Sequence, residues 1–241
     1  MNKLILCEGE TDAILLSYYL ERVAGWAYSK KCPQGLSIRA TAQNESVNWY
    51  KKDDDYLLIC AVGGKDNFKR FFNEKIRNPL ILVNAFEKIS IVTDRDNRDI
   101  ETIEASALSI FDVSDVEIRN NQWVDCCYTD QFGIVQTFRV LLVVIPTDQQ
   151  GALETEMLKA IAEDTYDKNI VEKTGAFANQ MRVEADRYIS SERLKLKAHL
   201  GLTWAIQFPE KVFTKIDEQI RNVRWEESET LRSCFAVLIE I

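Results

Sequence analysis

Short apolar runs alternate with amphipathic stretches in the first half of the chain. Residues 3–7, 56–62 and 88–93 are apolar runs of strand length, and each ends at a turn of glycine or acidic residues. After each turn, apolar residues recur at the spacing of a helix. Three strand–turn–helix units in a row predict an α/β fold in which helices flank a parallel sheet.

The pattern changes in the second half, where strands give way to helices. We expect the most apolar run to form a buried strand and to follow a hairpin near residues 130–133. The expected strands are 115–119, 123–128 and 134–145, and the expected helices are 151–162, 168–188, 193–208 and 210–224. The chain thus divides into an α/β domain, residues 1–150, and a mainly helical part, residues 151–241, that packs on it or completes it.

Three segments complete the expected fold. Residues 30–50 predict a loop with a short strand at 36–40, and residues 233–241 predict either a terminal strand or a packed tail. The helix expected after Gly64 should turn four apolar side chains toward the core. These are Phe68, Phe71, Phe72 and Ile76.

Composition excludes several classes of protein. The chain has 241 residues, 46% hydrophobic and 28% charged, which is ordinary for a globular protein rather than a disordered one. Six cysteines without CxxC spacing and a single histidine, His199, argue against both a disulfide framework and a zinc site. We find neither a signal peptide nor a run long enough to span a membrane, and expect a cytoplasmic protein without a membrane partner.

Acidic residues follow two of the three predicted strands. Glu8 and Asp12 come after the first strand, and Asp94 and Asp96 come after the third. Ligand sites of parallel sheets form beyond the carboxyl ends of the strands, and carboxylates are the ligands that Mg²⁺ and Mn²⁺ prefer. Residues two apart in an extended segment share a face, so Asp94 and Asp96 can point at one ion. The sequence therefore predicts an acidic metal site.

Each acidic segment also has a purely structural interpretation. Residues 10–12 suit the first turn of a helix, and residues 94–99 suit a solvated turn. The net charge of −8 is equally compatible with an acidic metal site and with solubility alone. It argues against strong, sequence-independent binding of nucleic acid. Only the joint occurrence of both segments, each after a predicted strand, favours the metal site.

The same segments resemble the Toprim family. LCEGETD is similar to the first Toprim motif, VTDRD to the second, and the glycine turn in AVGGKDNF falls between them, so the resemblance covers roughly residues 1–115. It implies that Glu8 is a general acid/base or a metal ligand, and that Asp94 and Asp96 are ligands of Mg²⁺ or Mn²⁺. Backbone near Gly9, Gly63 and Gly64, with the Lys65 side chain, would contact phosphate or nucleic acid.

Two later segments resemble the OLD-type (overcoming lysogenization defect) Toprim nucleases. GALETEML is similar to their Gly-x-Leu-Glu segment, which implies a further metal ligand at Glu154, with Glu156 as a substitute. ERLKLKAHL is similar to their Asp-Lys-x-Lys stretch and makes Lys195 a catalytic candidate that neutralises phosphate charge. Glu192 and Arg193 replace Asp-Lys there, which puts this match in doubt. The phosphate-binding loop of an ATPase, GxxxxGK[ST], is missing from this chain.

These observations favour a divalent-metal-dependent nuclease that hydrolyses phosphodiester bonds in DNA or RNA. Two alternatives stay open: a non-enzymatic Toprim module that binds nucleic acid or protein, and a small-molecule phosphoryl or nucleotidyl transferase. The expected partners are nucleic acid, an ATPase or another protein, and a second copy of the chain. The setting that the resemblance implies is DNA repair or phage defence.

Overall fold

The computed structural model describes residues 1–77, 85–111, 113, 116–129 and 133–241. Contacts within the chain group these residues into two compact units. The sheet unit comprises residues 1–93, 98–144 and 235–241, and the helical unit comprises residues 94–97 and 145–234.

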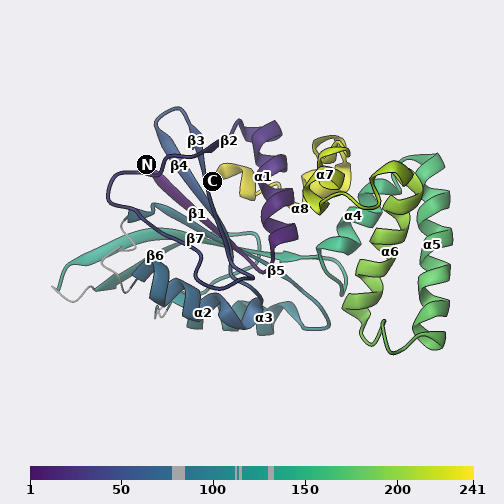
Figure 1. The fold of residues 1–241 in the computed structure, drawn as a ribbon. Helices are drawn as coiled ribbons and strands as arrows, with labels where there is room; N and C mark the ends of the chain where they lie inside the picture. The colour runs from purple at the N-terminus through teal and green to yellow at the C-terminus, as the bar shows by residue number, and fades with distance from the viewer. Residues whose placement is uncertain (78–84, 112, 114–115, 130–132) are drawn as a thin grey trace. The chain divides into compact units, whose positions relative to one another are not determined.

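The described strands form one mixed sheet (Figure 1). Its strands are β1 Asn2–Cys7, β2 Ala27–Ser29, β3 Ser46–Lys52, β4 Asp55–Ala61, β5 Lys88–Asp94, β6 Trp123–Thr129 and β7 Val135–Ile145, in the order β2-β3-β4-β1-β5-β7-β6. Strand β1 pairs in parallel with both β4 and β5, whereas β2–β3, β3–β4 and β6–β7 pair antiparallel. The α/β prediction is confirmed, but only the centre of the sheet is parallel.

Helices make up most of the C-terminal third of the chain, as predicted. The α-helices are α1 Glu10–Ala24, α2 Phe68–Phe71, α3 Ile100–Phe111, α4 Leu153–Ile161, α5 Thr165–Glu184, α6 Glu192–Gln207, α7 Ile216–Arg221 and α8 Glu229–Cys234. The shorter turns are η1 Lys65–Asn67, the π-helical η2 Phe72–Arg77, η4 Pro209–Lys211, η5 Trp225–Glu227 and η6 Leu238–Glu240. In the part of the chain that the structure describes, no helix is both long and apolar enough to cross a membrane.

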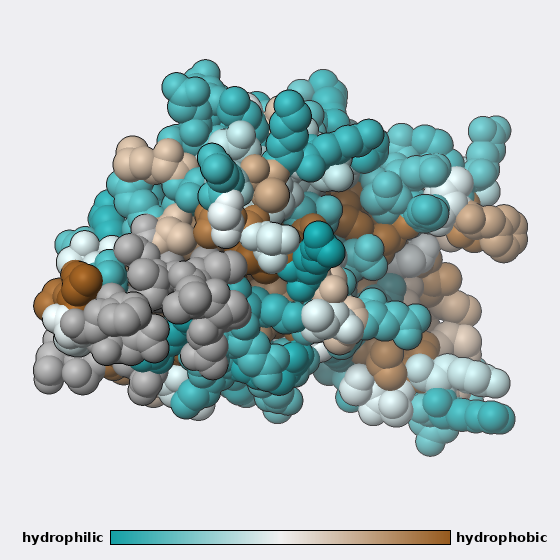
Figure 2. Space-filling model, turned by 60° about the vertical axis from the view of Figure 1, so that its left-hand side comes forward, coloured by the Kyte–Doolittle hydropathy of each residue, from teal (hydrophilic) through white to brown (hydrophobic). Residues whose placement is uncertain are grey.

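One cluster of core residues in the sheet unit lies between the sheet and the helices α2 and α3 (Figure 1), and a second set of buried residues lies on α1. Alternate residues of β1, β4, β5 and β7 face this layer, such as Leu4 and Leu6 of β1, because side chains along a strand point to opposite faces. The four apolar residues predicted to face inward after Gly64 are all buried. Outside the core, the face of the molecule in Figure 2 is mostly hydrophilic, with small apolar patches.

Several predicted elements differ from the structure. Residues 36–40 and the described residues of the strand predicted at 115–119 are not strands, although Leu36 and Ile38 are buried. The helix predicted over 210–224 is interrupted between η4 and α7. The tail forms η6 rather than a strand, and the Phe235 ring packs 5.1 Å from that of Tyr19. Most of the predicted hairpin turn lies outside the described residues, but β6 and β7 pair as predicted.

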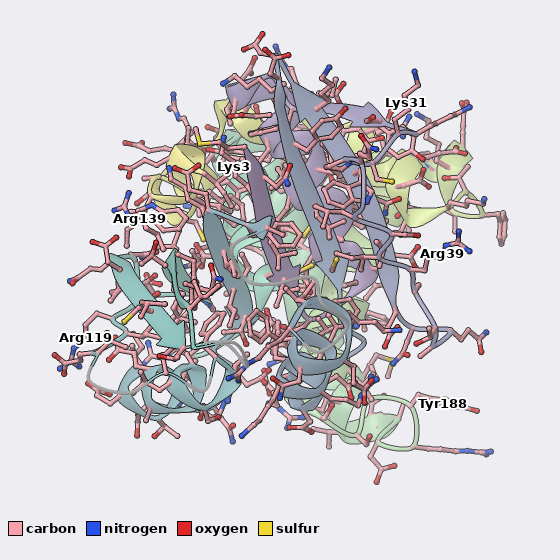
Figure 3. All side chains as sticks on the ribbon, turned by 90° about the vertical axis from the view of Figure 1, so that its left-hand side faces the viewer. Lys3, Lys31, Arg39, Arg119, Arg139 and Tyr188 are labelled. Atoms are coloured by element: carbon pink, nitrogen blue, oxygen red, sulfur yellow. The ribbon has the colours of Figure 1, made fainter. Side chains whose placement is uncertain are left out.

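Ion pairs on the sheet unit connect segments that are distant in sequence. Lys3 Nζ lies 2.5 Å from Asp55 Oδ2, and Arg119 Nη1 lies 2.9 Å from Glu104 Oε2; Lys3 and Arg119 are labelled in Figure 3. Glu104 also accepts a hydrogen bond from the backbone N–H of Asn120. The carboxylate of Glu104 thus fixes the segment before β6 to α3.

Candidate functional site

Glu8 follows β1 directly and is almost fully buried, with 1% of its surface exposed. The Thr93 hydroxyl on the neighbouring strand β5 donates a 2.6 Å hydrogen bond to Glu8 Oε1. The Gly64 N–H, from the turn after β4, donates a 2.8 Å bond to the Glu8 backbone carbonyl. Strand β1 pairs with β4 and β5, so both of its neighbours hold this acid at the carboxyl end of the parallel core.

Asp12 serves the start of α1. Its Oδ2 accepts a 2.7 Å hydrogen bond from the backbone N–H of Gly9, the residue that caps the helix. This satisfies a donor that the helix start would otherwise leave without a partner. The structure therefore gives Asp12 the capping role that the sequence allowed, and Gly9 is its partner.

Packing, rather than an open approach to a ligand, explains the glycine at position 63. Its φ is 79°, and a Cβ there would lie 2.5 Å from the side-chain nitrogen of Asn44. Asn44 and Asn67 each donate a 2.9 Å hydrogen bond to the Gly63 carbonyl. The neighbouring Gly64 has a φ of 118° and sends its N–H to Glu8, and Lys65 begins η1 directly after it.

The Asp94–Asp96 segment belongs to the helical unit and pairs with the residues before α4. The N–H groups and carbonyls of Asp96 and Gly151 exchange two backbone hydrogen bonds of 2.7 and 2.9 Å. Asp94 is 5% exposed, and its Oδ1 accepts a 2.9 Å bond from the N–H of Leu153, the first residue of α4. The structure thus brings the second Toprim-like motif together with the GALE segment.

Asp96 does not continue the extended geometry of β5. Its φ is 53°, in the left-handed region that few residues other than glycine adopt. Strand alternation, the reason for expecting Asp94 and Asp96 on one face, therefore does not apply to this pair. The left-handed turn instead aims the backbone of Asp96 at Gly151.

Two buried glutamates in the first turn of α4 differ in their surroundings. Glu156 Oε1 lies 2.8 Å from Lys159 Nζ, an ion pair one helical turn along. Glu154 is 7% exposed, and among the described residues its carboxylate makes neither a hydrogen bond nor an ion pair. Of the two, Glu154 is consequently the carboxylate that is left for a ligand, and its role as a metal ligand stays a prediction.

A cationic side chain does lie beside Asp94, but it is not Lys195. Arg193 Nη2 is 3.9 Å from Asp94 Oδ2, whereas Lys195 pairs with Glu192 on its own helix α6. The hydrogen bond from the Lys195 ammonium lowers the pKa of Glu192 below its usual range. Burial raises this pKa, and the positive charges of Lys195 and Arg182 lower it further. Arg193 was not predicted as a site residue. It stands at the first lysine of the Asp-Lys-x-Lys stretch to which ERLKLKAHL was compared, and an arginine there does not match that stretch.

Carboxylate oxygens are hard donors, the kind that Mg²⁺ and Mn²⁺ prefer. Among the described residues, no group of three or more His, Cys, Asp or Glu side chains is clustered to hold a metal ion. Magnesium, however, is commonly bound through one or two carboxylates, with waters and substrate phosphates completing the octahedron. Glu8 and Asp94, each buried and each at the end of a strand, are the described acids that could serve as such ligands.

Comparisons with known proteins place the chain in a family without naming an activity. No curated protein matches it. The crystal structure of hypothetical protein PH0156 from Pyrococcus horikoshii OT3 is similar over 98% of this chain and 99% of that chain, with 15% sequence identity and a TM-score of 0.47. A family model matches residues 2–239, and the chain therefore belongs to the family described as "Protein of unknown function (DUF3226)".

Proposed function

We propose that this chain is a divalent-metal-dependent nuclease of the Toprim type that hydrolyses phosphodiester bonds. The observation that carries the proposal is the position of Glu8. It is buried at the carboxyl end of the central parallel strand and receives a hydrogen bond from Thr93, the residue directly before Asp94. An acid is expensive to bury, and one at this edge of a parallel sheet is typical of a ligand-binding site.

The proposed roles follow from the chemistry of each side chain. A bound Mg²⁺ or Mn²⁺ ion would polarise the phosphate and lower the pKa of a bound water. Asp94, oriented by the Leu153 N–H, would serve as a ligand, and Glu154 and Asp96 as further candidates. Glu8 would transfer a proton at the attacking or leaving oxygen, or bind the ion. Arg193 would offset negative charge on the phosphate, because a guanidinium pairs well with phosphate oxygens.

One observation favours a competing proposal, a Toprim module that binds without cutting. Fewer than three acids cluster among the described residues, and a binding module does not need a complete metal site. The buried Glu8 argues the other way, since a scaffold gains nothing from a desolvated acid at a ligand edge. A small-molecule phosphoryl or nucleotidyl transferase would use the same acids on another substrate.

The decisive experiment is a cleavage assay on supercoiled plasmid, linear duplex, single-stranded DNA and structured RNA, with Mg²⁺, Mn²⁺ or EDTA. We expect metal-dependent cutting that Glu8→Gln and Asp94→Asn each reduce about 100-fold or more, since both act on the reacting phosphate. Matched controls are Glu10→Gln and Glu101→Gln, exposed acids that follow the same two strands. Both controls should cut at the wild-type rate.

The same assay separates the alternatives. Cutting that persists in EDTA, or in both Glu8→Gln and Asp94→Asn, would contradict the proposal. If no substrate is cut but calorimetry shows Mg²⁺ binding that Asp94→Asn abolishes, the binding module or the small-molecule transferase is supported instead. Absence of both cutting and ion binding would make the acids structural.

A further inference from the structure

Residues 27–52, which span β2, the following loop and β3, are basic in an otherwise acidic chain. They hold five lysine and arginine residues and one acid, Glu45, whereas the whole chain has 30 Lys+Arg against 38 Asp+Glu. Glu45 is buried, and its Oε1 lies 3.1 Å from Arg70 Nη2. The exposed charges of this segment are therefore all positive, on Lys30, Lys31, Arg39, Lys51 and Lys52.

The loop between the two strands carries the cations that a partner can reach, Lys30, Lys31 and Arg39. All three are exposed, and among the described residues none of their side chains forms an ion pair or a hydrogen bond. The other two cations of the segment are followed directly by Asp53 and Asp54, which offset their charge. The excess of positive charge is thus greatest on the loop.

Packing holds this loop in place although it forms neither a helix nor a strand. Leu36 and Ile38 are buried in the core of the sheet unit, with 9% and 7% of their surfaces exposed. Arg39 follows Ile38 directly, and its side chain is exposed. Figure 3 shows Lys31 and Arg39 on the same side of the sheet unit. The cations are therefore presented by a loop that is anchored on the core.

The loop runs from the β2 edge of the sheet to the end of the sheet where Glu8 lies. It ends at Ser46, which pairs with Ala61, the last residue of β4. Two residues earlier, Asn44 donates a 2.9 Å hydrogen bond to the Gly63 carbonyl, and the next residue of that turn donates its N–H to the Glu8 carbonyl. The basic loop and the proposed site are thus joined through one glycine turn.

We propose that Lys30, Lys31 and Arg39 form a surface that binds the phosphate backbone of a nucleic acid and leads it to the end of the sheet where Glu8 lies. The inference rests on the proposed function, because it assigns this surface to the substrate of the Glu8 site. Exposed cations without an acidic partner attract a chain of phosphates whatever its sequence. Since the net charge of −8 opposes binding over the whole surface, a local excess of positive charge is what nucleic acid requires here.

The neighbouring side chains favour nucleic acid over an anionic membrane. Tyr28, two residues before Lys30, is 61% exposed and offers an aromatic face on which a base can stack. Binding at a membrane interface uses large apolar side chains that enter the lipid. No large aliphatic side chain is exposed in residues 27–52.

The inference is tested by fluorescence anisotropy of labelled single-stranded and duplex oligonucleotides, in EDTA and at several salt concentrations. The loop variant Lys30→Gln/Lys31→Gln/Arg39→Gln should weaken binding about tenfold or more at about 0.1 M salt. The slope of log Kd against log salt should fall in magnitude by about 2–3, because each phosphate contact contributes about 0.7–0.9. If this variant does not fold, as judged by circular dichroism, Lys31→Gln alone should lower the slope by about 1.

A matched control removes the same charge from exposed positions of the helical unit. This variant, Lys173→Gln/Lys215→Gln/Arg232→Gln, should bind oligonucleotides like the wild type. Equal weakening in the control and the loop variant would overturn the inference, as would unchanged binding in the loop variant or no binding of any oligonucleotide. Tighter loop-dependent binding to phosphatidylserine vesicles than to oligonucleotides would also overturn it and assign the surface to a membrane.

Failure of this inference differs from failure of the proposed function. Glu8→Gln should lose cleavage but keep oligonucleotide binding, because the loop cations rather than the Glu8 carboxylate hold the phosphates. In the cleavage assay, the loop variant should raise the KM for the polymer about tenfold. Metal-dependent cutting with an unchanged KM in the loop variant would remove the surface and leave the nuclease. Loop-dependent binding without cutting of any substrate would support the surface and remove the nuclease.

Discussion

The two buried acids of the proposed site, Glu8 and Asp94, are held in different ways. Glu8 extends from a strand that has a parallel partner on each side, and its carboxylate receives the hydroxyl of Thr93. Asp94 ends its strand and receives the N–H of Leu153, a residue 59 positions later in the chain. The first acid is positioned by the sheet unit, and the second by the start of a helix in the helical unit.

This difference determines which substitutions should disturb each acid. A strand inside a sheet is fixed by many backbone hydrogen bonds, so one substitution moves it little. The position of Asp94 depends on the backbone hydrogen bonds of the two residues after it, Arg95 with Ile145 and Asp96 with Gly151, and on the first turn of α4. We therefore expect the Asp94 side of the site to be the more sensitive to changes outside the acids themselves.

Outside the two acids themselves, the largest effect is expected from Gly151→Ala. The φ of Gly151 is 149°, and a Cβ would lie 2.5 Å from the hydroxyl of Thr155. That hydroxyl cannot rotate away without cost, because it accepts the N–H of Ala152 at the start of α4. We expect a loss of about 1–3 kcal/mol in the free energy of unfolding, and a cleavage rate that falls with the displaced Asp94.

Gly201→Ala is the matched control for that prediction. Gly201 lies inside α6, and a Cβ there would meet no atom within 4 Å. Alanine should stabilise this helix by about 0.5–1 kcal/mol, because it loses less conformational entropy than glycine. Urea unfolding of both variants measures the contrast, and a Gly151→Ala protein as stable as the wild type would show that the pairing does not position Asp94.

The contrast between the two acids also explains what the sequence could predict. The position of Glu8 follows from a local pattern, an apolar run, a turn and a helix, which predicts β1 and α1 with nearly correct ends. The contact of the Asp94–Asp96 segment with Gly151 joins residues more than 50 positions apart. No local pattern reports such a pairing, so the family resemblance alone suggested that the two segments act together.

The fold predictions that were wrong have the same physical origin. Leu36 and Ile38 alternate as in a strand and are buried, yet their backbone forms no ladder, because burial alone does not supply a partner strand. Strand β3, which was missed, is half polar in sequence and exists because it pairs with β4. In both cases tertiary pairing, rather than local propensity, decided the structure.

The second prediction concerns the support of Glu8. Thr93→Val keeps the shape of the side chain but removes the hydroxyl that donates to Glu8. Taking one donor from a buried carboxylate costs about 1–3 kcal/mol, and we expect cleavage to fall about tenfold, which corresponds to 1.4 kcal/mol. Thr93→Ser keeps the hydroxyl and should retain most of the activity. Similar rates for the valine and serine variants would show that this hydrogen bond has no part in catalysis.

The third prediction compares two cations on α6. Arg193→Gln should lower the cleavage rate about tenfold, because the Arg193 guanidinium is the cation beside Asp94. Lys195→Gln should change the rate by less than about threefold, because the Lys195 ammonium pairs with Glu192 instead. Steady-state rates on whichever polymer is cut measure both variants. A larger loss in Lys195→Gln would return the catalytic role to Lys195.

The smallest effect is expected from Asp55→Asn. Asp55 belongs to the sheet unit and is far in sequence from both Glu8 and Asp94. Hydrogen bonds from the Lys3 ammonium and then from the terminal ammonium hold the pKa of Asp55 below its usual 3.8. A carboxyl with a lowered pKa stabilises the fold above its usual pKa, and that contribution is lost as the pH falls through the folded-state pKa. Asp55→Asn should therefore cost up to about 1 kcal/mol near neutral pH and almost nothing at about pH 2.

Urea unfolding at those two pH values measures the difference, with the exposed neighbour Asp54→Asn as the control. Asp54 should show no change at either pH, because no ion pair is formed by it among the described residues. If Asp55→Asn were equally destabilising at both pH values, the charge of Asp55 would not be the cause.

Cleavage should be unchanged in both variants, because Asp55 begins β4 at the end opposite to Gly63 and Gly64. A fall in cleavage would mean that the Glu8 side of the site is as sensitive to distant changes as the Asp94 side, and the contrast between the two acids would be lost.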